Sequence, residues 1–225
     1  MDKRALAGFL DLANHHQEAT PEKIRDLCHQ VIKSGFHTAF VNPCYVGLAR
    51  EVVGPDGLVG TVVSFPLGQD SRDVKILAAV SAARQGSDEL DVCLNVGKFK
   101  AGLADEVLEE ARAIVEAVKA VKKLTVVKFI IETGLLTDEE IKEAAILVLK
   151  SGADFVKTCS GMGPRGATLK DVALIKSVVG GQIKIKVAGG IGTYQEAVAF
   201  IKAGADRIGT SKAVEIINGC PADSK

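Results

Sequence analysis

The sequence has no excess of charge of either sign. Among its 225 residues, 28 lysines and arginines balance 28 aspartates and glutamates. A protein that attracts nucleic acid or an anionic membrane over long range needs a clear basic excess. We therefore expect neither as a partner, and any anionic ligand must be held by groups close to it.

Long apolar segments are also lacking. No segment approaches membrane-spanning length, roughly 20 residues, without a charge. The first residues, MDKRALAGFLDLANHH, lack the continuous apolar stretch of a secretory signal peptide. By default, we expect a cytoplasmic location.

The cysteines and histidines do not form the patterns of a disulfide framework or a metal site. The five cysteines are odd in number and contain no CxxC spacing, which argues against both paired disulfides and a thiolate metal site. His15 and His16 adjoin Glu18, but consecutive side chains point apart on a helix or a strand. We expect no bound metal.

No composition break or low-complexity linker divides the chain, and its 47% hydrophobic content suffices for one substantial core. We expect a single domain over residues 1–225. Short β-branched runs alternate with longer amphipathic stretches, which is typical of βαβ units. The expected strands are Leu10–Ala13, Thr38–Val41, Val59–Ser64, Glu89–Leu94, Val126–Glu132, Phe155–Thr158, Lys184–Val187 and Arg207–Gly209. The expected helices are Pro21–Lys33, Ser71–Gln85, Ala104–Lys122, Thr137–Lys150, Leu169–Val178 and Thr193–Lys202. Eight such units predict an α/β fold of the TIM (β/α)8 barrel type, with a doubly wound sheet as the alternative.

Two lysines end neighbouring apolar segments. Lys157 stands in GADFVKTCSG and Lys186 in IKIKVAGGI. A lysine must be neutral to attack a carbonyl, and its ordinary pKa is ~10.4. A second ammonium at ~5 Å, in an effective dielectric of ~20, would disfavour protonation by ~3 kcal/mol, or roughly two pKa units. The pair therefore predicts Schiff-base chemistry, although either lysine could instead simply reach solvent.

Two further charged residues lie inside apolar strand patterns. These are Asp91 in DELDVCLN and Lys128 in TVVKFIIETG. Together with Lys157 and Lys186 they place a charge on each of four consecutive strands. A salt bridge would explain any one pair, but four buried charges together are costly unless they serve a function.

Several longer motifs, in order along the chain, resemble the deoxyribose-phosphate aldolase family. They are VNPCYV, SFPLG, DELDV, VVKFIIETGLLTDEE, FVKTCSG with GAT, KVAGGI and RIGTS. The similarity runs from about Leu10 to Gly219 and implies a TIM barrel. It also implies reversible cleavage of 2-deoxy-D-ribose 5-phosphate to acetaldehyde and glyceraldehyde 3-phosphate through a lysine imine, without metal or other cofactor. A homodimer or homotetramer is expected on the same ground.

The resemblance also implies roles for particular residues. Lys157 would form the imine, Lys186 would lower its pKa, and Asp91 would act with Lys186 and a water in proton transfer. Asp11 and Lys128 would lie at the substrate, Lys128 also positioning Asp91. The remaining substrate-binding residues implied are Thr158, Gly161, Gly189, Gly190, Gly209 and Ser211.

The glycines among these residues suit phosphate binding, because TIM barrels often hold phosphate on backbone amides after strands seven and eight. The fragment GMGPRG, residues 161–166, also fits GxGxxG. Pro164 follows its second glycine and a reactive lysine precedes it, so we interpret that match as chance.

The chain departs from the family pattern at Ala13, where threonine is usual, at Gly192, where arginine is common, and at Lys212, where small residues are usual. The final PADSK lacks the tyrosine of longer members. Lys212 or Arg165 could supply the missing positive charge at the phosphate. Substrate range is therefore open: the chain is a deoxyribose-phosphate aldolase, a related Schiff-base aldolase, or a silent barrel, and the complete set of lysines and aspartate argues against the last.

Lys184 shares a strand face with Lys186 but lies deeper in the barrel. An unpaired ammonium there is expensive. It should either pair with Glu89, which shares a face with Asp91, or reach solvent at the bottom of the barrel.

Overall fold

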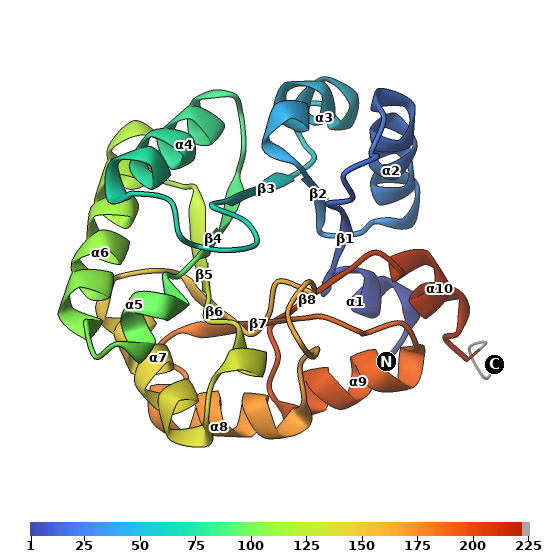
Figure 1. Cartoon of the computed structure of the whole chain (residues 1–225). Helices are drawn as coiled ribbons and strands as arrows, with labels where there is room; N and C mark the ends of the chain where they lie inside the picture. The colour runs from blue at the N-terminus through green and yellow to red at the C-terminus, as the bar shows by residue number, and fades with distance from the viewer. Residues whose placement is uncertain (222–225) are drawn as a thin grey trace.

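The computed structural model describes residues 1–221, in which eight parallel strands close into one barrel in the order β1 to β8 (Figure 1). The strands are β1 (Leu10–Asn14), β2 (Thr38–Val41), β3 (Val59–Val63), β4 (Glu89–Cys93), β5 (Val126–Ile130), β6 (Phe155–Lys157), β7 (Lys184–Ala188) and β8 (Arg207–Thr210). β1 pairs with both β2 and β8. That closure confirms the TIM barrel and excludes the open doubly wound sheet.

The helices surround the barrel (Figure 1). They are α1 (Lys3–Ala7), α2 (Pro21–Ser34), α3 (Val46–Val53), α4 (Arg72–Arg84), α5 (Val96–Lys100), α6 (Ala104–Val121), α7 (Asp138–Lys150), α8 (Leu169–Val179), α9 (Tyr194–Ala203) and α10 (Ala213–Asn218). Two 3-10 turns, η1 (Pro43–Tyr45) and η2 (Thr133–Leu135), follow β2 and β5. None of the helices of the described residues is long and apolar enough to cross a bilayer.

The six longer predicted helices are present, and the local signals that predicted them are visible. Thr137 and Glu140 form a capping box at the start of α7, each side chain accepting a hydrogen bond from the other residue's backbone N–H. Such caps contribute about 1 kcal/mol because they satisfy amides that have no partner inside the helix. The four helices without a sequence prediction, α1, α3, α5 and α10, have at most eight residues.

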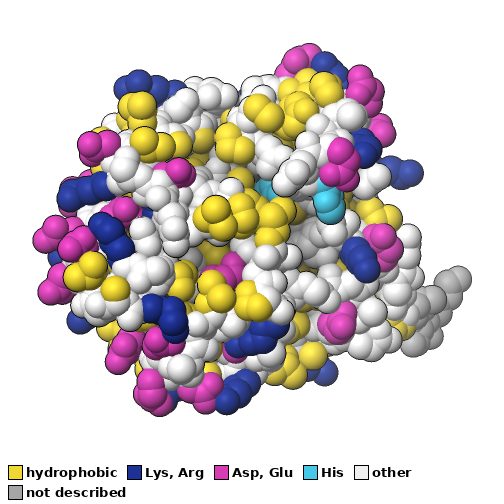
Figure 2. All heavy atoms as spheres, viewed as in Figure 1, with side chains coloured by type: hydrophobic (Ala, Val, Ile, Leu, Met, Phe, Trp, Pro, Cys, Tyr) yellow, Lys and Arg dark blue, Asp and Glu magenta, His cyan; other side chains and the backbone are white. Residues whose placement is uncertain are grey.

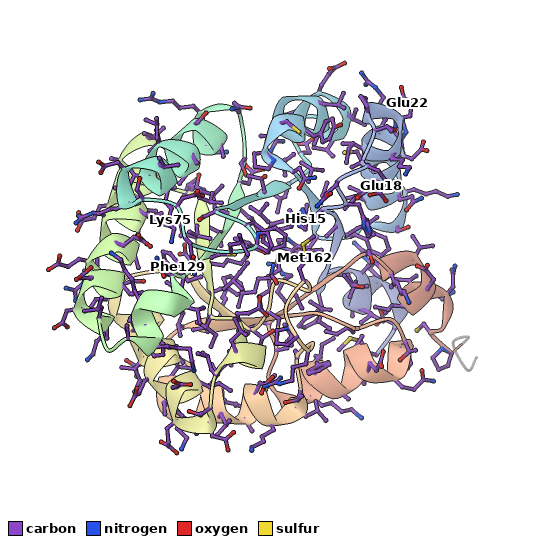
Figure 3. The ribbon with its side chains drawn as sticks, viewed as in Figure 1. His15, Glu18, Glu22, Lys75, Phe129 and Met162 are labelled. Atoms are coloured by element: carbon purple, nitrogen blue, oxygen red, sulfur yellow. The ribbon has the colours of Figure 1, made fainter. Side chains whose placement is uncertain are left out.

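The apolar core lies between the strands and the helices, because parallel strands are covered on both faces in this fold. On α6, a buried stripe repeats at helical spacing, and it consists of Val107, Ala111, Ile114, Val115 and Val118. Lys75 interrupts the apolar packing: it extends from α4 and bonds Glu110 Oε1 at 2.6 Å and the carbonyl of Cys93 at 3.1 Å (Figure 3). The inside of the barrel itself is largely polar, and that is where the site lies.

All predicted strands begin at the residue expected from the sequence, and their ends differ by no more than two residues. The parallel register sets the same-level neighbours: Asp91 lies beside Lys128, and Lys157 beside Lys186. Every second side chain of a strand points into the barrel, so inward side chains of neighbouring strands meet there at the levels set by the register. Of the terminal PADSK, only Pro221 lies within the described residues.

Candidate active site

Asp91, Lys128, Lys157 and Lys186, the four charges predicted on consecutive strands, all point into the barrel and are at most 3% exposed. Asp91 on β4 is fully buried and stands at the centre of the group. Its Oδ2 lies 2.7 Å from Nζ of Lys157 and 2.7 Å from Nζ of Lys186, while its Oδ1 lies 3.2 Å from Nζ of Lys128. One carboxylate thus contacts three amines.

These amines govern the protonation of Asp91. Burial alone would raise the pKa of this carboxyl, but the charges of Lys128, Lys157 and Lys186 outweigh burial and hold its pKa well below the usual value. The carboxylate is therefore ionised throughout the neutral range. It can accept hydrogen bonds from two amines through a single oxygen, which makes it a route for a proton between them.

Lys186 is the most enclosed of these amines after Lys128. Besides Asp91, its Nζ lies 2.7 Å from Oδ2 of Asp11 and 3.6 Å from the centre of the Phe40 ring. Burial lowers the pKa of Lys186 to about 8, assisted by the charges of Lys128 and Lys157 and opposed by the two carboxylates. A lysine of this pKa exchanges protons readily near neutral pH.

Lys157 has fewer contacts and borders the cavity. Asp91 is the one carboxylate within ion-pair distance of its Nζ among the described residues. Its side chain is 4% exposed, against 1% for Lys186 and 0% for Lys128. Among the three amines, Lys157 is the one that an aldehyde in the cavity reaches most directly.

A second group of charges lies beneath the first. Nζ of Lys128 is 2.5 Å from Oε2 of Glu89, and Nη1 of Arg207 is 3.0 Å from Oδ1 of Asp11 and 3.3 Å from Oε1 of Glu89. These partners, together with the ammonium of Lys186, lower the pKa of Glu89 to about 2 although its burial acts in the opposite sense. We call the seven residues the charge cluster: Asp11, Glu89, Asp91, Lys128, Lys157, Lys186 and Arg207.

Arg207 was not predicted as part of the site. It opens β8, and the register places it beside Lys186. The sequence contained a signal for it, because Arg207 is two residues before Gly209 on the same strand and so shares its face, and Gly209 was predicted at the site. With Arg207, four cationic groups face three carboxylates, so the charge cluster balances when one lysine is neutral.

Asp11, His37 and Glu89 come close enough together to consider a metal: one ligand atom from each lies within 4.8 Å of the others. Arg207 already occupies the space between them. Its Nη1 contacts Asp11 and Glu89 as described and lies 2.5 Å from Nδ1 of His37. A cation would have to displace this guanidinium, so the residues do not suit a metal ion.

The predicted pairing of Lys184 with Glu89 is wrong. Lys184 is exposed at the start of β7, and its Nζ lies 5.6 Å from the centre of the Phe155 ring. Glu89 is engaged by Lys128 and Arg207 instead. The alternative, in which a long lysine reaches solvent at the barrel bottom, is the one observed.

A cavity of about 230 Å³ opens above the charge cluster at the carboxyl ends of the strands. Figure 2 shows this face, with most charged side chains toward the rim and hydrophobic side chains nearer the centre. The predicted site residues that line it are Asp91, Lys157, Gly161, Lys186, Gly189, Gly190, Gly209 and Ser211.

Three predicted substrate-binding residues lie outside this cavity. Asp11 and Lys128 are fully buried in the charge cluster below it. Thr158 is also fully buried, and its hydroxyl accepts a bond from the Ala188 amide at 3.2 Å and donates to the Ala188 carbonyl at 3.4 Å, which ties β6 to β7. These residues can influence the substrate only through the groups they hold.

The glycine pair after β7 permits a close approach between two loops. Gly189 and Gly190 both have positive φ, at 95° and 80°. A Cβ on Gly166 would lie only 2.2 Å from the Gly189 carbonyl oxygen, so the loop after β6 packs directly on this backbone. The contact holds both loops at the cavity edge where the phosphate was predicted.

Two further amides after β7, beyond those predicted to bind the phosphate, are occupied by the protein itself. Oε2 of Glu196 accepts hydrogen bonds from the amides of Gly192 and Thr193, at 2.9 and 3.0 Å, and so caps the start of α9. The amides left for a phosphate are those nearer Gly190 and Ser211. No arginine stands at position 192, and Lys212 lies in its place: its Cδ is 3.0 Å from a Cβ built on Gly192.

Lys212 and Arg165, the two candidate cations, differ in their surroundings. Lys212 lines the cavity. Arg165 does not line it: its guanidinium bonds Asp171 at 2.6 and 3.0 Å and the carbonyl of Thr133 at 3.0 Å. Of the two alternatives, this geometry favours Lys212, since the donors of Arg165 are engaged within the loop after β6.

The rim of the cavity includes residues that the sequence did not single out for this role. His15, Phe40 and Phe65 line it, with Met162 beside them (Figure 3). Ser64, directly after β3, and Glu132, two residues after the end of β5, are the non-glycine residues of residues 1–221 with positive φ, at 55° and 51°. Such strained positions concentrate at functional sites. Here they redirect the chain where it passes over the barrel.

Comparison with known proteins gives a consistent result. Residues 1–218 match the family model described as DeoC/LacD family aldolase. A deoxyribose-phosphate aldolase of Clostridium kluyveri is 43% identical over 219 residues, covering 97% of this chain and 99% of that protein. One from Thermococcus kodakarensis is 42% identical over 224 residues, with 98% and 99% covered. The tetrameric deoxyribose phosphate aldolase from Aeropyrum pernix superimposes with a TM-score of 0.87 at 31% identity, covering 96% of this chain and 91% of that one.

Proposed function

Because the chain belongs to the DeoC/LacD family of aldolases, we propose that it cleaves 2-deoxy-D-ribose 5-phosphate reversibly to acetaldehyde and D-glyceraldehyde 3-phosphate through an imine on Lys157. The curated relatives above carry the name deoxyribose-phosphate aldolase. The observation that carries the choice of nucleophile is that Lys157 borders the cavity with a single carboxylate partner.

The charge cluster supplies the neutral amine. Lys157 and Lys186 both contact Oδ2 of Asp91, so a proton that leaves Lys157 passes by way of this oxygen to Lys186. The lowered pKa of Lys186, about 8, leaves part of its population neutral and able to receive that proton. Lys157 is then neutral, and its lone pair attacks C1 of the open-chain sugar. Loss of water from the carbinolamine, with a proton kept on nitrogen, gives the protonated imine.

Cleavage breaks the bond between C2 and C3 of the sugar. The C3 hydroxyl loses its proton as its carbon becomes the aldehyde of glyceraldehyde 3-phosphate, and the bonding electrons move to C2 to form an enamine on Lys157. A water held by Asp91 and Lys186 accepts the first proton and returns one to C2. Hydrolysis of the resulting imine releases acetaldehyde and restores the lysine.

The phosphate would lie at the other end of the cavity. The backbone near Gly190 and Ser211 and the ammonium of Lys212 border that end. Amides supply only partial charges, whereas Lys212 supplies a full one. The cavity thus spans from a nucleophile to a cationic end, which suits a short phosphorylated aldol.

Reduction with borohydride tests this function. With acetaldehyde present, it should fix one ethyl group on Lys157, located by peptide mass, and the protein should release glyceraldehyde 3-phosphate from deoxyribose 5-phosphate. A label on Lys186 would overturn the choice of nucleophile. Comparing deoxyribose with deoxyribose 5-phosphate under the same conditions decides whether the phosphate is recognised.

We also propose that the chain forms a homodimer or a homotetramer. The support is the relative from Aeropyrum pernix, whose structure is described as tetrameric. Light scattering after size exclusion should give a mass that is two or four times 23.6 kDa. A monomer at micromolar concentration would contradict the proposal.

A further inference from the structure

His15 follows β1 and lies at the mouth of the cavity, where Figure 3 shows it above the barrel opening. Its ring is 5.2 Å from that of Phe65 and 6.3 Å from that of Phe40, centre to centre. Both aromatic residues also line the cavity. The imidazole therefore packs near both aromatic rings, and it lines the same cavity as Lys157.

The imidazole has a polar atom without a partner. Nδ1 of His15 is buried and makes no hydrogen bond to any of residues 1–221. Buried polar atoms in folded proteins are almost always paired, and an exception calls for an explanation. A substrate hydroxyl next to the imidazole would supply a hydrogen-bond partner that the protein itself does not provide.

The surroundings keep His15 uncharged. Burial, assisted by the charges of Lys157 and Lys186 and opposed by that of Asp91, lowers its pKa to about 3. A neutral imidazole has one donor and one acceptor. Such a weakly basic imidazole is a poor proton acceptor at neutral pH, so it is unsuited to the C3 hydroxyl, whose proton must leave during cleavage. It is suited to a hydroxyl that keeps its proton.

We propose that His15 is a specificity-determining residue that hydrogen-bonds the C4 hydroxyl of the substrate, the group that is the C2 hydroxyl of the acceptor aldehyde in the reverse reaction. The inference rests on the proposed aldolase function. C4 lies between the reacting C3 and the phosphate-bearing C5. His15 correspondingly follows β1, whose neighbour β8 leads to Ser211 and Lys212 at the cationic end of the cavity.

The synthetic direction tests the proposal, because there the hydroxyl can be omitted. Acetaldehyde is added either to D-glyceraldehyde 3-phosphate or to 3-oxopropyl phosphate, which has the same length and phosphate but no C2 hydroxyl. His15→Leu keeps an apolar side chain between the two aromatic rings and removes the polar atoms. It should lower kcat/KM for the hydroxylated acceptor about tenfold more than for the deoxy acceptor. His15→Gln, which restores a donor and an acceptor, should recover part of the difference.

His29, which is exposed on α2, provides the matched control. His29→Leu should leave the ratio of the two acceptors at its original value. Equal losses of kcat/KM on both acceptors in His15→Leu, or no loss on either, would overturn the proposal. It would also be overturned if the ratio of the two acceptors in His15→Gln were no closer to that of the parent protein than in His15→Leu.

The proposed function is tested separately by the parent protein. Borohydride labelling of Lys157 and cleavage of deoxyribose 5-phosphate do not depend on the His15 variants. If the parent protein shows neither, the aldolase proposal fails. If it shows both and the acceptor ratio is unchanged by His15→Leu, only the role of His15 is wrong.

Discussion

Nζ of Lys186 lies 3.6 Å from the centre of the Phe40 ring, so an aromatic face covers one side of the most enclosed amine that borders the cavity. An ammonium over an aromatic face is stabilised by up to ~2 kcal/mol when water is excluded. Gly60 on β3 leaves room for this ring, because a Cβ at that position would come within 2.3 Å of Phe40 Cζ. The glycine is therefore part of the support for Lys186.

Replacing Gly60 with alanine should destabilise the protein by about 1–3 kcal/mol, because the added methyl would overlap the Phe40 ring and force it to move. The measurement is urea unfolding. Gly47→Ala on α3 is the control, since nothing lies within 4 Å of a Cβ at that position. It should be neutral or slightly stabilising, as alanine favours a helix. Equal effects of the two substitutions would show that Phe40 can move at no cost.

Lys186→Met should reduce cleavage at least a hundredfold and move the pH optimum upward by about one unit. Without the second ammonium, Oδ2 of Asp91 pairs with Lys157 alone and stabilises its protonated form, so a higher pH is needed for the neutral amine. The pH profile of kcat/KM is the measurement. Lys184→Met, two residues earlier on β7 and exposed, should leave the profile unchanged. A fall in rate without a shift would assign Lys186 to proton transfer alone.

Lys212→Ala should raise KM for deoxyribose 5-phosphate about tenfold and change the cleavage of deoxyribose little, which is the pattern of lost ground-state binding. Arg165→Ala should act differently. It leaves the buried Asp171 carboxylate without its guanidinium and should cost about 1–3 kcal/mol of stability without selecting between the two substrates. A selective effect at Arg165 would restore it to the phosphate site.

His15 should make the protein less stable as the pH falls below about 6.5. Its folded-state pKa is about 3, so the unfolded chain takes up a proton in this window and the folded one does not. At pH 5 the loss amounts to about 2 kcal/mol, at ~1.36 kcal/mol for each pKa unit. Lys157, Lys186 and Asp91 are the charged groups that face it, and none has an ordinary pKa in that range.

The measurement is the free energy of unfolding at pH 7 and at pH 5, in the parent protein and in His15→Leu. The variant should lose less stability between these two values, by about 2 kcal/mol. His29→Leu again serves as the control. Parallel losses in parent and variant would mean that the imidazole becomes protonated in the folded protein.

The strands could be located from the sequence because each is a short β-branched run between longer amphipathic stretches. Lys157 and Lys186 were identifiable because a long cation inside such a run has no packing role. The short helices could not be found, since α5 and α10 have five and six residues and their positions depend on tertiary packing. The strands are therefore determined by local sequence here, whereas the short helices in the connections are determined by tertiary packing.

The level at which each charge lies could be predicted only in part. Period-two spacing correctly grouped Glu89 with Asp91, but it assigned Lys184 a partner inside the barrel, whereas that side chain turns out to solvent. The partners of Glu89 come from β5 and β8, which are distant in sequence. His15 was considered as a metal ligand, because its place near Phe40 on β2 and Phe65 after β3 depends on contacts between segments that are distant in the sequence.

The excess of one cation in the charge cluster bears on which intermediate the barrel favours. A protonated imine on Lys157 adds a unit of positive charge to a cluster that is balanced when this amine is neutral. The enamine that forms when C2 gives up a proton carries no charge. In a buried site, where a net charge is expensive, the interior of the barrel should therefore shift the equilibrium between these two species toward the carbon nucleophile.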